Sequence, residues 1–191
     1  GSGAGLVSTY LVIEELAKVD LLTAMIVHDQ NVSPRIIANH GPDELKRRLV
    51  PRFVSGELEC SIAWTEPQAG SDGTAIRTAA VRDGDEVLIN GSKIFTTFGD
   101  RADMHLVYAR FGPSSGAKGI GTIVVERDRP GLTVRKLEGK MGVRGAAMRD
   151  HEAERGSVAS RRAGVHDVER SDHERDQVTG ERLRFRELPR L

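Results

Sequence analysis

The sequence predicts an α+β protein in which a partial N-terminal helical domain is followed by a small antiparallel β-barrel domain. Up to about residue 58, apolar residues recur at spacings of three and four, the period of an amphipathic helix. From Cys60 onward the apolar period is two, in short runs separated by turn residues. We therefore divide the chain into a helical domain at 1–58, a β domain at 59–147 and a tail at 148–191.

The helical domain is expected to contain four helices. Leu6 and Tyr10 begin the apolar stripe of the first helix, and Gly41 with Pro42 separates the third from the fourth. Pro51 is expected to end the fourth helix, because proline lacks the amide hydrogen that continues a helix. The predicted helices are 6–17, 21–30, 33–39 and 43–50.

The β domain is expected to contain short strands whose spacing is typical of a small barrel or a sandwich. Asp83, Gly84 and Asp85 lie between two of the strand-like runs and predict a hairpin, because Asp and Gly tolerate the positive φ that tight hairpin turns need. The predicted strands are 60–65, 77–82, 86–89, 94–97, 104–110, 121–126 and 132–134.

The tail at 148–191 differs sharply in composition from the rest of the chain. It carries no Lys, ten Arg, ten acidic residues and three His, with no apolar stripe. A segment with so few large apolar side chains cannot bury enough surface to offset the entropy lost on ordering. We therefore expect the tail to be disordered, with a weak, solvated helix as the alternative.

Charge and cysteine content restrict the class of protein. The 28 Lys and Arg balance the 28 Asp and Glu, so a net charge of +0 offers no electrostatic drive toward nucleic acid or an anionic membrane. The one cysteine, Cys60, excludes an intramolecular disulfide and is expected to lie buried in a strand. No apolar run approaches the roughly 18 residues of a membrane helix, and the start of the chain has no signal-peptide pattern. We expect a cytoplasmic protein that spans no membrane.

Two motifs of the β domain carry a family resemblance. WTEPQAGSD at 64–72 begins where a predicted strand ends, and INGSKIFTTFG at 89–99 follows it across the predicted hairpin. The helical passages LVIEELAKVD and HGPDELKRRLVPRFVSGELE, and the later GKMGVRG, occur in matching order. Together these segments, over about 5–145, resemble the acyl-CoA dehydrogenase family.

The resemblance also indicates what this chain lacks. Family members carry further helices before the first matching one and a C-terminal four-helix bundle after the β domain, which residues 146–191 do not match. An Arg-rich tail without Lys is what translation of a GC-rich gene in a wrong reading frame would yield. We therefore interpret the chain as a truncated or frameshifted fragment of a family member, inactive by itself.

The resemblance implies a flavoprotein oxidoreductase of fatty acid metabolism that uses FAD. Such an enzyme removes an α-proton and a β-hydride from an acyl-CoA substrate and releases a trans-2-enoyl-CoA. The resemblance further implies an electron-transferring flavoprotein as electron acceptor and a homo-oligomer for the full-length protein. The matching cofactor-binding positions are Ile62, Trp64, Thr65, Gly70, Ser71, Phe95, Thr96 and Thr97, and Ser71 also matches a substrate-binding position near the thioester.

These residue types suit a flavin, whose ring has apolar faces and polar edges. Phe95 can cover a face of the ring, and the hydroxyl groups of Thr65, Ser71 and Thr97 can satisfy its edges. Thr97 is expected to bond the edge near N5. Each of these residues alone would more often be an ordinary strand, turn or core residue, so the interpretation depends on the ordered set.

No catalytic residue is assigned in this chain, because the family's base is a carboxylate that the C-terminal bundle supplies. Glu66 is expected to fix the geometry of its loop by hydrogen bonds instead. His28 and His40 lie twelve residues apart with no carboxylate at metal-ligand spacing, so no metal site is predicted.

Two functions remain open at this point: an acyl-CoA dehydrogenase represented by an incomplete chain, or a non-catalytic remnant that serves as a flavin-binding or acyl-CoA-binding module. The genomic reading frame just after Gly145 would separate them, since family-like sequence resuming in another frame would show that the complete enzyme is encoded. Nucleic-acid binding by the tail is not favoured, because its ten Arg are balanced by ten acidic residues.

Overall fold

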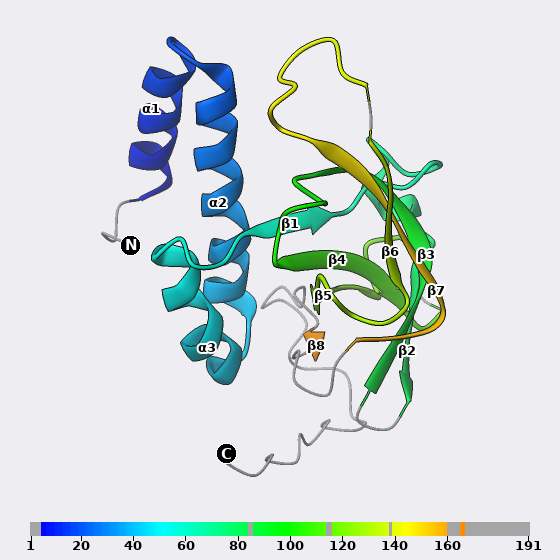
Figure 1. The fold of residues 1–191 in the computed structure, drawn as a ribbon. Coiled ribbons are helices and arrows are strands. Elements are labelled where there is room, and N and C mark those ends of the chain that lie inside the picture. Colours follow the sequence, from blue (N-terminus) through cyan, green and yellow to red (C-terminus); the bar gives the residue numbers. More distant parts are fainter. Residues whose placement is uncertain (1–4, 84–85, 114–115, 138, 160–164, 167–191) are drawn as a thin grey trace.

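The computed structural model describes residues 5–83, 86–113, 116–137, 139–159 and 165–166. Three helices come first in the chain, and a curled sheet of strands follows (Figure 1). The predicted α+β order, with helices before the sheet, is therefore confirmed. The helices are α1 (Leu6–Ala17), α2 (Leu21–His40) and α3 (Asp43–Val54).

Two prolines lie inside helices, and one of them, Pro51, was predicted to end its helix. Pro34 is buried within α2, so the two helices predicted at 21–30 and 33–39 are one continuous helix. Pro51 lies within α3, which runs four residues beyond the end predicted at residue 50. A proline removes one helical hydrogen bond, and the packing of these helices on each other and on the sheet outweighs that loss.

The sheet is mixed rather than purely antiparallel. Its eight strands follow the order β6-β7-β3-β2-β4-β5-β8, and β1 pairs with β4 off this path. The pairs β1–β4 and β2–β4 are parallel. The remaining pairs are antiparallel. The strands are β1 (Cys60–Ala63), β2 (Ala79–Asp83), β3 (Glu86–Thr97), β4 (Met104–Phe111), β5 (Ile120–Glu126), β6 (Leu132–Leu137), β7 (Met148–Ala159) and β8 (Val165–His166).

Strand β3 combines the two strands that were predicted at 86–89 and 94–97. Between them lies Gly91, where an added Cβ would stand 2.7 Å from the Thr78 Cα, so this crossing of two backbones requires glycine. The predicted hairpin before β3 agrees with the pairing of β2, in which Asp83 stands opposite Glu86. Gly84 and Asp85 themselves lie outside the described residues.

Strand β7 corrects the boundary predicted at residue 147. Instead of starting a disordered tail, Met148–Ala159 pairs antiparallel with both β3 and β6. His151 and Ala153 of β7 line a small cavity of the sheet, and the strand joins its neighbours β3 and β6 through backbone pairing. Beyond β7 only 165–166 are described, so the disorder predicted for the rest of the tail lies outside the described residues.

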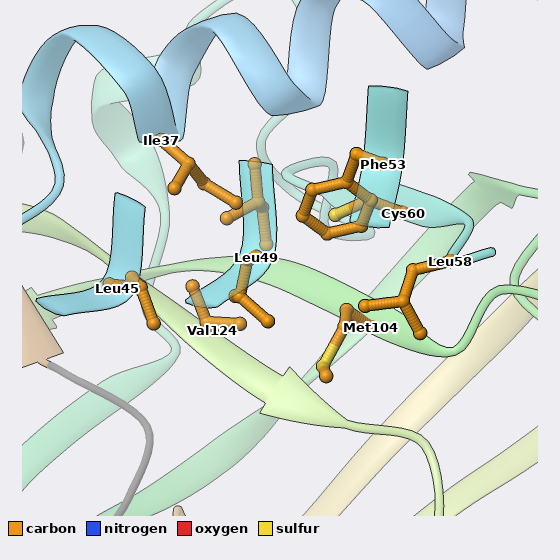
Figure 2. Close-up of a cluster of buried hydrophobic side chains, with 9 residues drawn as sticks. Ile37, Leu45, Leu49, Phe53, Leu58, Cys60, Met104 and Val124 are labelled. Carbon is orange, nitrogen blue, oxygen red and sulfur yellow. The ribbon is translucent and has the colours of Figure 1, made fainter. Parts of the chain in front are cut away.

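The core continues from the helices into the sheet. One cluster of nine buried residues joins α2 and α3 to β1, β4 and β5, and Figure 2 shows its side chains converging from both sides. Cys60 belongs to this cluster with 0% exposure, as predicted, and burial raises the pKa of its thiol to about 12. The cluster comprises Ile37, Leu45, Leu49, Phe53, Leu58, Cys60, Met104, Leu106 and Val124.

Candidate cofactor site

The loop at Trp64–Asp72 begins where β1 ends and turns at once. Glu66 and Ala69 exchange backbone hydrogen bonds of 3.1 and 3.0 Å, which close a tight turn. Gly70 and Ser71 follow this turn and are exposed. A Cβ on Gly70 would meet no atom within 4 Å, so the backbone at this position faces open space. The loop therefore presents main-chain groups and a hydroxyl outward.

The second predicted motif lies at an irregular part of β3. The register between β3 and β7 shifts between Lys93 and Thr96. Phe95, inside this bulge, has a φ of 57°, a conformation that costs a bulky residue about 1–3 kcal/mol. Its side chain is nevertheless 50% exposed, and its amide donates to Asp150 Oδ1 at 3.4 Å. The bulge thus turns an aromatic ring out of the sheet, where part of the ring is open for packing.

The loop and the bulge lie side by side. The Ile94 amide donates to the Thr65 carbonyl at 2.8 Å, so the start of the loop is bonded to the residue that precedes Phe95. Two motifs about thirty residues apart in the sequence therefore form one continuous surface. The motifs contribute an exposed aromatic ring, an open glycine backbone and the hydroxyls of Ser71 and Thr65.

The predicted cofactor-binding residues divide by exposure. Thr96 is only 1% exposed, so its side chain is buried in the protein. Ile62 packs against the helix–sheet core, and Trp64 lies against Tyr108 with ring centroids 4.0 Å apart, so both side chains serve packing. The residues whose side chains or backbone are exposed are Gly70, Ser71 and Phe95, and those that are half-buried are Ile62, Trp64, Thr65 and Thr97.

Glu66 fixes the geometry of the loop, as the sequence predicted. Its side chain is 3% exposed and accepts hydrogen bonds from the Arg77 amide at 2.6 Å, the Thr78 amide at 3.0 Å and Lys93 Nζ at 2.7 Å. Burial raises the pKa of Glu66, but these hydrogen bonds outweigh burial and lower it to about 2. A carboxylate held ionised in this way is a poor acceptor of a substrate proton.

The sequence analysis missed Lys93. A signal was present, because Val87, Ile89, Gly91 and Lys93 alternate on one side of β3, and an inward lysine at the end of that series needs a carboxylate partner. Which carboxylate it meets depends on how the loop folds across the sheet, and spacing alone does not reveal that.

Two buried histidines were also missed. His105 on β4 is 0% exposed, its Nδ1 lies 2.7 Å from Ser61 Oγ, and its ring centroid is 4.7 Å from that of His151 on β7. His151 Nε2 donates to the Gly99 carbonyl at 3.0 Å. Both rings line an interior cavity of about 30 Å³, which has room for about two water molecules and none for a flavin. This cavity is therefore not a site for a flavin.

The buried histidines make the fold sensitive to acid. Burial lowers the pKa of His105 to about 3, with His151 and Arg127 acting in the same direction. Because an unfolded histidine titrates near pH 6.5, the unfolded state binds more protons below that pH. The free energy of unfolding should therefore fall by about 1.4 kcal/mol per pH unit for this residue, from about pH 6.5 down toward its folded pKa.

Urea unfolding at several pH values between about 7.5 and 4.5 measures this slope. His105→Gln should reduce the slope by about one proton, since it removes the group that the unfolded state protonates. His28→Gln is the matched control, because the His28 side chain is 40% exposed on α2. An unchanged slope in His105→Gln would show that His105 is not the source of the acid sensitivity.

Neither a metal cluster nor a membrane helix is present in the part of the chain that the structure describes. No group of three or more His, Cys, Asp or Glu within the described ranges is placed to hold a metal ion. Among the same residues, no helix has the length and apolar character needed to cross a membrane.

Comparison with known proteins identifies the two structural parts. The model for the N-terminal domain of acyl-CoA dehydrogenases matches residues 1–57, and the model for their middle domain matches residues 61–155. The second match extends into β7, in agreement with the corrected boundary. A cyclohex-1-ene-1-carbonyl-CoA dehydrogenase of Geobacter metallireducens is 44% identical over 147 residues, which cover 76% of this chain and 39% of that protein.

Solved structures share the fold. An acyl-CoA dehydrogenase from Geobacillus kaustophilus matches with a TM-score of 0.78 and 34% identity, over 88% of this chain and 45% of that one. A glutaryl-CoA dehydrogenase from Mycobacterium smegmatis in complex with FADH2 matches with a TM-score of 0.76 and 29% identity, over 85% and 41% of the two chains. The chain thus spans less than half the length of these relatives. With consecutive domains of one family matched in order, and with the fold shared, the chain belongs to the acyl-CoA dehydrogenase family.

Proposed function

We propose that the surface formed by the Trp64–Asp72 loop and the β3 bulge is one wall of an FAD site in an acyl-CoA dehydrogenase. The observation that carries the proposal is Phe95, an aromatic ring held half-exposed by a left-handed backbone beside a loop whose Gly70 faces open space. Strain of this kind persists where the surrounding structure enforces it, typically at a binding site. Because the chain spans only part of its relatives, the activity of the whole protein is part of the proposal.

The residues fit the chemistry of the cofactor. Phe95 offers an apolar face for a flavin ring, while the hydroxyls of Ser71, Thr65 and Thr97 offer partners for its polar edges. Gly70 lets the ligand approach the main chain, because a side chain at this position would project into the open space. When bound, FAD supplies the two-electron acceptor for the dehydrogenation of a saturated acyl-CoA. The contribution of this chain is to bind the ring, orient it and exclude water from one side.

Glu66 does not act as the general base in this proposal, because its burial, its donors and its low pKa commit it to the loop. The family resemblance assigns the base to the C-terminal helical part, and it also implies an electron-transferring flavoprotein as acceptor and a homo-oligomer. A cytoplasmic location is proposed from the sequence, whose one cysteine, Cys60, has no partner for an intramolecular disulfide.

The site predicts the effect of one substitution on cofactor affinity. Thr97→Val keeps the shape of the side chain but removes the donor, so a polar atom of the flavin loses a partner at a cost of about 1–3 kcal/mol, and FAD affinity should fall about tenfold. Titration of FAD into the chain, followed by quenching of flavin fluorescence, measures this loss. Thr133→Val is the control, because Thr133 is an exposed residue of β6. Because this chain supplies one wall of the site, the proposal is wrong if FAD binds neither the parent chain nor the parent chain joined to the C-terminal part of a relative.

A second experiment separates the enzyme from a non-catalytic binding module. A chimera would join residues 1–155 of this chain to the remaining C-terminal part of the Geobacter relative. Loaded with FAD and mixed anaerobically with saturated acyl-CoAs, it should lose the flavin band near ~450 nm, while the 191-residue chain alone should not. A chimera that binds FAD and acyl-CoA without bleaching would favour the module.

A further inference from the structure

A buried ion pair ties the two halves of the candidate site together from inside the sheet. Lys93 Nζ and Glu66 Oε1 lie 2.7 Å apart, and the two side chains are 4% and 3% exposed. Glu66 belongs to the loop and Lys93 to β3, 27 residues later. The pair therefore connects elements that are distant in sequence, at the point where they form the cofactor surface.

Lys93 holds the loop at two points. Its ammonium donates to Glu66 and also to the Trp64 carbonyl at 2.9 Å, so it spans the first turn of the loop. The carboxylate in turn accepts from the amides of Arg77 and Thr78, which follow the loop. Lys93 on β3 thus holds the start of the loop directly, and through Glu66 it also holds the residues that follow the loop.

The same strand position leads directly into the bulge. Ile94, the next residue, donates its amide to the Thr65 carbonyl at 2.8 Å, and Phe95 follows. A shift of Lys93 would therefore move the exposed ring and the loop relative to each other. A binding site needs such separations to hold within about 0.5 Å, which flexible loops reach only with support from beneath.

We propose that Glu66 and Lys93 form a positioning pair that sets the distance between the two segments of the cofactor wall. The inference rests on the proposed function, because it assumes that the loop and the bulge held by this pair bind the flavin. Stability alone is a weak explanation, because well-packed apolar residues commonly replace a buried ion pair without loss. Hydrogen bonds from this pair reach both the loop and β3, and they fix the position of one relative to the other. Apolar packing has no such directional contacts.

The test uses the double variant Glu66→Gln/Lys93→Met, which removes both charges; Gln has the length of Glu, and Met is one atom shorter than Lys. Two readouts are compared: hydrogen exchange of the Ile94 amide relative to the Leu106 amide in the β4–β5 ladder, and FAD affinity by titration. We expect protection of Ile94 to fall about tenfold or more with Leu106 unchanged, and FAD affinity to fall about tenfold. Glu57→Gln is the matched control, because Glu57 pairs with Arg52 at the same 2.7 Å on the surface of the helical part.

The outcomes are distinct. If the parent binds FAD and the double variant keeps both Ile94 protection and affinity within about twofold, the positioning role is wrong and the proposed function stands. Loss of protection at Leu106 as well would show a general structural role and would also overturn the inference. If FAD binds neither the parent nor the chimera with the C-terminal part of the relative, it is the proposed function that fails. Should the double variant not fold, Lys93→Met alone, in which Glu66 keeps its amide donors, is read in the same way.

Discussion

Replacing Glu66 by alanine should lower the free energy of unfolding by about 3–5 kcal/mol, because it leaves the ammonium group of Lys93 buried without its charged partner. Lys93 is 3% exposed, so neither solvent nor a small movement of the side chain can replace the carboxylate. Burial already lowers the pKa of Lys93, and Glu66 is what opposes that effect. Glu57→Ala is the control, since an exposed pair contributes at most about 1 kcal/mol. Urea unfolding of the parent and both variants gives the comparison.

The difference between parent and Glu66→Ala should depend on pH with a defined sign. The pKa of Glu66 is lowered to about 2 in the folded chain from about 4.5, so its contribution is present above about pH 4.5 and is lost as the pH falls toward 2. The gap in unfolding free energy should therefore be constant from about pH 7 to pH 5 and shrink below about pH 4.5. A gap that persists unchanged at about pH 3 would mean that the charge of Glu66 is not what the fold uses.

The sequence predicted that the helices come before the sheet, but several predicted ends were misplaced for a physical reason. Pro34 and Pro51 are local signals of termination, whereas the continuity of α2 and α3 comes from packing that no local signal reports. Strand β7 was missed for the converse reason. Its cavity-lining residues, His151 and Ala153, carry no apolar period, and its place is set by pairing with β3 more than fifty residues earlier.

In the candidate site, too, features contained in one stretch of sequence were predicted, and features that depend on partners far away in the chain were not. The loop and the Phe95 segment were found as motifs, and their order carried the interpretation. Lys93, His105 and His151 were not found, because each is defined by a partner that only the folded sheet supplies, namely Glu66, Ser61 and Gly99. The left-handed backbone of Phe95 was equally hidden, since an aromatic residue gives no sign in sequence of a φ that glycine would normally adopt.

The structure joins the helices and the sheet through one core, which predicts that they unfold together. Leu49 on α3 is 1% exposed and belongs to the cluster that reaches Met104 and Val124 in the sheet (Figure 2). Leu49→Ala should lower the free energy of unfolding by about 2–5 kcal/mol, as expected for a leucine whose removal leaves a cavity. Val54→Ala is the control on the same helix, because Val54 is 58% exposed and should change stability by no more than about 0.5 kcal/mol.

Two probes report the two parts of the molecule during that unfolding. Far-ultraviolet circular dichroism is dominated by the helices, whereas the fluorescence of Trp64, the one tryptophan of the chain, reports the β domain, where its ring packs on Tyr108. If the core is shared, Leu49→Ala should shift both transitions by the same amount, and the two curves should coincide in the parent and in the variant. A variant in which the circular dichroism transition moves while the Trp64 transition stays in place would show that helices and sheet fold independently. In that case the buried contacts between Leu49 and the sheet would not couple the two parts. The decrease in the free energy of unfolding measured for Leu49→Ala would then concern the helices alone.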